Sequence, residues 1–284
     1  MILLPGSAPL VPISFSLAAV LVWGTSDFLG GYAARRGDAF VVATAAHTGG
    51  LLLMCTLAVV AHAPFPSGRS LVWALLAGAS GGTALAFFYR ALAIGRMGLT
   101  APVAAILGAA IPTTFSIFTE GYPGTIRVFG FLLAGIGIWL ISRTEDGAGT
   151  EGIGLAALAG LGFAGFYLGM REAGEGSALW LATFTRVGGL MITATIVIGA
   201  QSFHEIAPSA ARWGVLAGCL DVTGTALFVR ASQTGRLDTA VVLTSLYPAV
   251  TVLLARLVLR EHFTRWKAVG IVAAMLAVPL VAAH

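Results

Sequence analysis

Ten apolar segments, each about as long as a membrane is thick, dominate this sequence. An α-helix needs roughly 20 predominantly apolar residues to cross the hydrocarbon core of a bilayer. Such segments cover residues 12–33, 39–61, 70–92, 99–118, 126–142, 152–171, 178–200, 212–231, 239–259 and 266–283. Short polar connectors, RRGD and SRTEDGAGTEG among them, separate these segments. The pattern predicts an all-α integral membrane protein with ten transmembrane helices.

The composition agrees with lipid as the solvent of this chain. Hydrophobic residues make up 58% of the chain and charged residues 10%, whereas soluble domains carry about 25% charged residues. The net charge of +4 does not indicate nucleic-acid binding, because the arginines are scattered singly and form no basic stripe with interleaved aromatic residues. We therefore expect a lipid bilayer as a partner and no nucleic acid.

The two halves of the sequence resemble each other. A shift of 140 residues pairs Trp73 with Trp213 and Phe88 with Phe228, and a shift of 139 places Gly49-Gly50-Leu51 on Gly188-Gly189-Leu190. Further identities are Ala77 with Ala217, Gly78 with Gly218, Thr83 with Thr223, Arg90 with Arg230, Gly95 with Gly235, Arg96 with Arg236 and Gly130 with Gly270. The sequence therefore predicts two repeats, residues 1–145 and 146–284.

Each predicted repeat holds five membrane helices, which is an odd number. The second repeat must then enter the membrane from the opposite side, so the two repeats are inverted relative to each other. Inverted repeats are typical of secondary transporters, in which the substrate site lies near the midplane between the repeats.

The sequence resembles the drug/metabolite transporter superfamily, specifically its ten-helix EamA-type branch. The first helix resembles the family's apolar–Trp–Gly–polar pattern at Val22-Trp23-Gly24-Thr25-Ser26. The stretch RASQTGRLDTAVVLTSLYPAVTVLLARLVLREHFTRWKAVG in the second half is similar to the family's small-residue helix followed by a proline-bearing helix, with Tyr247-Pro248 and Arg260-Glu261 in place. The resemblance covers essentially the whole chain. It implies a multi-pass protein of the cell membrane, of the bacterial inner or plasma membrane type, that moves small metabolites without hydrolysing ATP.

Two departures from the family pattern concern polar residues. The family tends to carry an arginine in the second helix of each repeat. Arg186 matches this position in the second repeat, whereas the first repeat has His47. Asp27 is not required by the general pattern, so it is a candidate for what distinguishes this chain from its relatives.

Asp27 is the most informative of the polar residues within the apolar segments. An ionised side chain at the centre of a bilayer costs about 2.5–3.5 kcal/mol on insertion scales, and such residues usually face a cavity or a partner. Trp23 and Asp27 are four residues apart and share one face of a helix. This face either lines a cavity, where Trp23 stacks on substrate and Asp27 binds a proton or a cationic group, or Asp27 holds neighbouring helices by hydrogen bonds.

Three further polar residues are candidates for substrate binding. Asp221 is a second candidate proton carrier, or a polar anchor that joins Thr225 or Thr223 to another helix. Arg186 either grips a substrate carboxylate or pairs with Asp27 or Asp221. His47 either titrates near neutral pH or serves as a neutral hydrogen-bonding residue.

Prolines and tyrosines complete the set of candidates. Pro112 and Pro248 free backbone carbonyls within their helices, which permits either a gating hinge or a static kink. Tyr167 and Tyr247 either present hydroxyls to a cavity or pack with one satisfied bond. Glu261 is expected to pair locally, with Arg260 or Arg265.

The sequence favours transport over catalysis. No GxxxxGK[ST], HExxH or GxSxG motif occurs, and His, Cys and acidic residues do not cluster at ligand spacing, so we expect no enzyme activity, no cofactor and no metal site. The predicted function is secondary transport of a small polar metabolite, such as an amino acid or a related organic compound, by alternating access, either facilitative or coupled to protons. The alternatives are a flippase for a lipid-linked substrate and a structural membrane subunit. A monomer and a homodimer are both compatible with the sequence.

Overall fold

The computed structural model describes residues 10–143, 151–201, 207–261 and 264–282, and these residues form helices and no strands. The helices are α1 (Leu10–Ala34), α2 (Ala39–Val60), α3 (Gly68–Ile94), α4 (Met97–Glu120), α5 (Thr125–Ser142), α6 (Ile153–Ala173), α7 (Ala178–Gly199), α8 (Pro208–Thr234), α9 (Leu237–Thr244), α10 (Tyr247–Leu259) and α11 (Arg265–Ala282). Ten stretches are long and apolar enough to cross a membrane, because α9 and α10 together make one span. The predicted fold class is confirmed in these respects.

Local chemistry fixes several helix ends. The Asp38 carboxylate accepts hydrogen bonds from the N–H groups of Phe40 and Val41, at 2.9 and 3.1 Å, and so caps the start of α2. These N–H groups have no partner within the helix, and an Asp at this position satisfies them. Gly121, which follows α4, has a φ of 83°, a conformation that glycine adopts without the steric cost of a Cβ.

The ninth membrane span differs from the continuous helix predicted over residues 239–259. It is interrupted at Ser245 and Leu246, between α9 and α10. Pro248 has no N–H group to donate to the carbonyl of Thr244, one turn earlier, so the hydrogen-bond ladder cannot pass through this point. By contrast, α4 continues without a break through Pro112.

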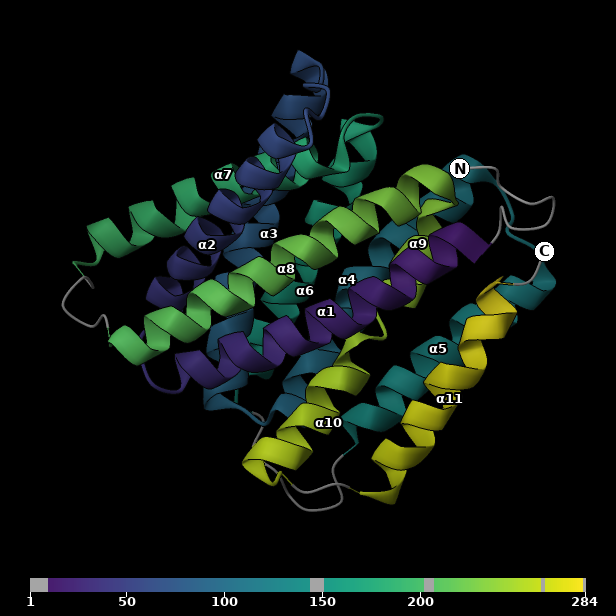
Figure 1. Cartoon of the computed structure of the whole chain (residues 1–284). Coiled ribbons are helices and arrows are strands. Elements are labelled where there is room, and N and C mark those ends of the chain that lie inside the picture. The colour runs from purple at the N-terminus through teal and green to yellow at the C-terminus, as the bar shows by residue number, and fades with distance from the viewer. Residues whose placement is uncertain (1–9, 144–150, 202–206, 262–263, 283–284) are drawn as a thin grey trace.

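Helices from the two halves of the chain pack side by side. In Figure 1, α1 lies along α8 and α5 lies along α11, while α2 and α7 cross at the other end of the molecule; α3 packs on α6. Exchanging the predicted repeats turns the α1–α8 pair into the α6–α3 pair and leaves α5–α11 and α2–α7 unchanged. Two inverted repeats would give this pattern of contacts, and the two-repeat arrangement stays a prediction. Its boundary between residues 145 and 146 lies outside the described residues.

Glycines at equivalent positions make the same helix crossing twice. A Cβ added to Gly78 would collide with the backbone of Thr185 in α7, and one added to Gly218 would collide with the backbone of Ala46 in α2. The shift of 140 relates the two glycines, and the shift of 139 relates Ala46 to Thr185. Small residues allow membrane helices to approach this closely, so a glycine sets the crossing in each half.

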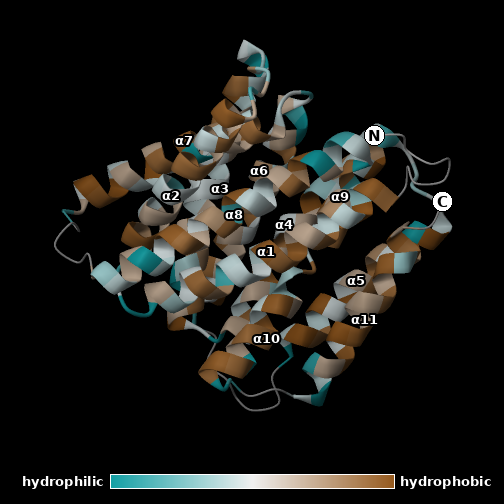
Figure 2. Ribbon diagram, in the orientation of Figure 1, coloured by the Kyte–Doolittle hydropathy of each residue, from teal (hydrophilic) through white to brown (hydrophobic). Residues whose placement is uncertain are grey.

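The outside of the bundle is apolar. Figure 2 shows hydrophobic residues along the outer helices, including α5, α7 and α11. Large apolar side chains are exposed there, among them Leu132, Leu257 and Val272. Contiguous apolar surface of this kind is rare on soluble monomers and is the surface that acyl chains cover. The chain is a multi-pass integral membrane protein.

Candidate functional site

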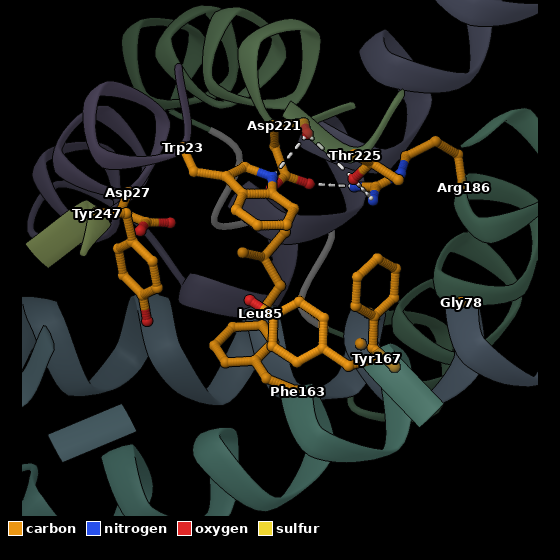
Figure 3. A pocket seen from close by; sticks show the side chains of 13 residues that line it. Trp23, Asp27, Gly78, Leu85, Phe163, Tyr167, Arg186, Asp221, Thr225 and Tyr247 are labelled. Carbon is orange, nitrogen blue, oxygen red and sulfur yellow. Dashed lines mark hydrogen bonds and ion pairs between the residues drawn. The ribbon is translucent and has the colours of Figure 1, made fainter. Parts of the chain in front are cut away.

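A cavity of about 50 Å³ lies near the middle of the membrane spans. Helices α1, α3, α6, α7, α8 and α10 contribute its walls, so both halves of the chain take part (Figure 3). The lining residues are Trp23, Asp27, Gly78, Gly81, Gly82, Leu85, Phe163, Phe166, Tyr167, Arg186, Asp221, Thr225 and Tyr247. We call this space the central cavity.

One wall of the central cavity carries an ion pair. The Arg186 guanidinium binds the Asp221 carboxylate and donates a second hydrogen bond to the Thr225 hydroxyl at 3.1 Å. Both charged side chains are nearly buried, at 7% and 11% exposure. Of the roles predicted for Arg186, the structure shows pairing with Asp221. Its guanidinium is therefore occupied and its charge is balanced.

The indole of Trp23 joins α1 to α8. Its Nε1–H donates to the backbone oxygen of Asp221 at 3.0 Å, and its ring lies 6.2 Å from that of Tyr167 and 5.8 Å from that of Phe228, centroid to centroid. Aromatic pairs at such distances contribute beyond the apolar area that they bury. Trp23 thus has a structural role on one side of its ring while it lines the cavity on the other.

Asp27 lines the same cavity without a partner. Its residue is 5% exposed, and the described residues offer its carboxylate no hydrogen bond and no ion pair. The hydroxyl of Tyr247, also buried, likewise has no hydrogen-bond partner among them. Figure 3 shows Asp27 and Tyr247 at the left of the cavity and Arg186 at the right. The two predicted proton carriers therefore differ: Asp221 is paired and Asp27 is not.

His47 is not among the residues that line the cavity. Its ring packs between Gly82 of α3 and Gly189 of α7, where a Cβ on either glycine would lie within 3.0 Å of a ring atom. Neither ring nitrogen has a hydrogen-bond partner among the described residues. His47 is the repeat equivalent of Arg186, yet only Arg186 reaches the cavity.

Several residues that line the cavity were not predicted to do so; Thr225 was predicted only as a partner of Asp221. Thr225 is four residues after Asp221 on α8, so the helical period alone places both on one face. Phe163 and Phe166 precede the predicted Tyr167 on α6 and line the cavity with it. Gly81 was recognisable as the repeat equivalent of Asp221. Within the described parts of the chain, no three His, Cys, Asp or Glu side chains come together as a metal site requires.

Ion pairs also lie at the ends of the bundle. Glu261 binds Arg35 at 3.0 Å and accepts hydrogen bonds from the first N–H groups of α4, those of Met97 and Gly98, at 3.4 and 3.3 Å. The predicted local pairing of Glu261 therefore misses the partner that the structure shows, which lies 226 residues away. A carboxylate at a helix N-terminus is favoured by the helix dipole.

At the opposite end, Arg236 closes the C-terminus of α4. It donates to the carbonyl oxygens of Glu120 and Gly121, at 3.2 and 2.8 Å, and pairs with the fully buried Asp238 at 2.8 Å. The hydrogen bond to Asp238 raises the pKa of the Arg236 guanidinium. This cation therefore stays charged where it satisfies the last carbonyls of the helix.

Comparisons with known proteins agree with this architecture. Residues 150–283 match the model of the EamA-like transporter family. None of the curated proteins matches the sequence. Among solved structures, 28 chains match. One of these, described only as a crystal structure of a protein, shares 17% sequence identity with a TM-score of 0.69 over 95% of each chain. Similarity at that identity shows the fold alone.

Proposed function

We propose that this chain is an EamA-like transporter of the drug/metabolite transporter superfamily, the family whose model matches residues 150–283. We further propose that it is a secondary transporter of a small polar metabolite, such as an amino acid or a related organic compound. The observation that carries this proposal is the central cavity, lined by both halves of the chain and holding an unpaired carboxylate, Asp27. Transporters with inverted repeats bind substrate at such a position, between the repeats near the membrane midplane.

In the proposed mechanism, one repeat rocks against the other around the central cavity. The break before Pro248 provides a bending point in the wall of the cavity, because α10 starts at Tyr247 and the backbone there lacks a continuous hydrogen-bond ladder. Pro112 provides a second candidate bend within the unbroken α4. Trp23, Tyr167 and Tyr247 form part of the substrate surface.

Asp27 is the proposed site of coupling. A carboxyl group in the membrane interior, with no cation of the protein beside it, binds either a proton or a cationic group of the substrate. Asp221 is the weaker candidate, because its charge is already balanced by Arg186. Proton-coupled transport and facilitative transport differ in whether the Asp27 proton crosses with each cycle. We place the protein in the cell membrane, as a monomer or a homodimer.

A flippase would need polar residues along a groove open to lipid. The hollow that faces outward between α3, α4 and α6 is lined by apolar residues and a single charged one, Glu172. Asp27, Arg186, Asp221 and Thr225 line the central cavity instead. This distribution favours a transporter of small molecules over a flippase for a lipid-linked substrate, and it gives the polar residues more than a structural role.

The proposal is tested with purified protein in proteoliposomes, by uptake of labelled amino acids and organic amines with and without an imposed pH gradient. We expect uptake by the wild type that Asp27→Asn abolishes. Glu175→Gln, which removes an exposed carboxylate, is the matched control and is expected to retain uptake. Wild-type rates in both Asp27→Asn and Asp221→Asn would remove the proton-carrier role. Wild-type transport by a variant changed at Asp27, His47, Arg186 and Asp221 together would assign these residues a structural role only.

A further inference from the structure

The charges that line the central cavity do not cancel. Among its described lining residues the charged ones are Asp27, Arg186 and Asp221. Arg186 and Asp221 neutralise each other, which leaves Asp27 as the lining group that becomes an unbalanced negative charge when it releases its proton to bind a cation. In a low-dielectric site an unbalanced charge is a strong determinant of what binds.

Arg186 is poorly placed to select a substrate by its carboxylate. Its guanidinium already binds the Asp221 carboxylate and the Thr225 hydroxyl, and its Nε–H contacts the Thr185 hydroxyl at 3.4 Å. An anionic ligand would have to displace a buried ion pair and would leave Asp221 without a partner, which is costly inside a protein. The cavity therefore disfavours anions on two counts.

Aromatic rings supply much of the remaining wall. They come from α1, α6 and α10 and line the same cavity as Asp27 (Figure 3). The rings are those of Trp23, Phe163, Phe166, Tyr167 and Tyr247. Aromatic faces attract cations, ammonium groups included, through their quadrupole. They also bury the apolar body of a ligand without demanding hydrogen bonds from it.

The Tyr247 hydroxyl is a second group that lacks a partner. It is buried, lines the cavity and forms no hydrogen bond with the described residues. Buried polar groups are normally satisfied, and an exception calls for an explanation. A ligand in the central cavity could supply the hydrogen-bond partner that the Tyr247 hydroxyl lacks.

From these observations we propose that the substrate of the central cavity is an organic monocation: a compound with one ammonium group and an apolar or aromatic body, and without a carboxylate. The ammonium group pairs with Asp27, while the body packs among the aromatic rings and gives the Tyr247 hydroxyl a partner. This inference rests on the proposed transport function and narrows its substrate class from amino acids to amines.

The experiment compares three probes that share one phenyl ring and differ in charge. These are the phenethylammonium cation, zwitterionic phenylalanine and the 3-phenylpropionate anion. Binding to the purified wild type in detergent at neutral pH is measured by isothermal titration calorimetry, and thermal stabilisation gives a second readout. We expect the cation to bind more tightly than either of the others.

Variants assign that binding to Asp27. We expect Asp27→Asn to weaken binding of the phenethylammonium cation about tenfold or more, Asp27→Glu to restore part of it, and Glu175→Gln to leave it unchanged. Unfolding midpoints of the unliganded variants show whether each is folded. Asn is neutral and isosteric, so loss of binding by a folded Asp27→Asn protein reports the charge itself.

Three results would overturn the proposal: no binding of the cation to the wild type, tighter binding of the zwitterion or the anion, or unchanged cation binding in Asp27→Asn. Binding or uptake of phenylalanine or phenylpropionate that depends on Arg186 would reject the monocation while leaving the transport function standing. Cation binding without uptake of any probe into proteoliposomes would reject transport and keep the site.

Discussion

The Arg186 guanidinium of α7 and the Asp221 carboxylate of α8 form an ion pair inside the membrane bundle, and the Thr225 hydroxyl accepts a further hydrogen bond from the same guanidinium. With side-chain exposures of 7% and 11%, neither charge has access to much water. The pair is therefore at once a link between two helices and the reason that Asp27 is the unbalanced charge of the central cavity.

Removing one member of this pair should be costly. We expect Asp221→Asn to lower the free energy of unfolding by about 3–5 kcal/mol, because Arg186 is left buried without a counter-charge. The double variant Arg186→Met with Asp221→Leu should lose much less unfolding free energy than the sum of the losses in the single variants Arg186→Met and Asp221→Leu. Unfolding in mixed micelles measures all of these variants. Additive losses would show that the two charges do not interact.

Replacing either of the two equivalent glycines, Gly78 or Gly218, by a residue with a side chain should destabilise the protein. We expect Gly78→Val and Gly218→Val each to destabilise the protein by at least about 1–3 kcal/mol, the usual cost of overpacking, because each Cβ would meet the backbone of a neighbouring helix. Gly135→Ala on α5, where a Cβ meets nothing within 4 Å, is the control and should be neutral or stabilising. Unequal effects of the two equivalent glycines would argue against a duplicated crossing.

Changes at Tyr247 and Trp23 should have different effects, the first on ligand binding and the second on stability. Since the Tyr247 hydroxyl has no partner among the described residues, Tyr247→Phe should leave the unfolding midpoint unchanged or higher while it weakens binding of phenethylammonium severalfold. Trp23→Phe removes the hydrogen bond to the Asp221 carbonyl and should cost about 1 kcal/mol of stability. Equal loss of stability in both variants would contradict this division of roles.

The carboxylate at the start of α4 should contribute modestly. Glu261→Gln removes the ion pair with Arg35 and a negative charge beside the helix N-terminus. Since both side chains are partly exposed, at 16% and 29%, we expect a loss of about 1 kcal/mol that shrinks as salt is added. Arg69→Gln, which breaks the more exposed pair with Glu172, serves as the control and should change little.

Pro248 should matter for transport more than Pro112 does. Pro248→Ala restores an N–H group that can reach the Thr244 carbonyl, so the ninth span can become one continuous helix. We expect this variant to be at least as stable as the wild type and to transport more slowly. We expect Pro112→Ala to slow transport less than Pro248→Ala does, because α4 already runs unbroken through Pro112. Rates of proteoliposome uptake for the two variants, with unfolding midpoints, decide between a hinge and a static kink.

The sequence by itself determined the features that depend on local pattern. Ten apolar stretches predicted ten spans because the length needed to cross a bilayer is a property of each segment alone. The helical period likewise placed Trp23 and Asp27 on one face, and both line the central cavity. The same period places Thr225 beside Asp221, as predicted for the polar-anchor role of Asp221.

Only the tertiary structure decided which of these residues meet. Arg186 could pair with Asp27 or Asp221, and it binds Asp221. Glu261 binds Arg35, which lies 226 residues away in the chain. His47, the repeat equivalent of Arg186, packs between Gly82 and Gly189 and is not among the residues that line the cavity. These outcomes depend on the rotation of each helix about its axis and on how closely the helices approach. Contacts between distant segments set both quantities, and no single segment encodes them.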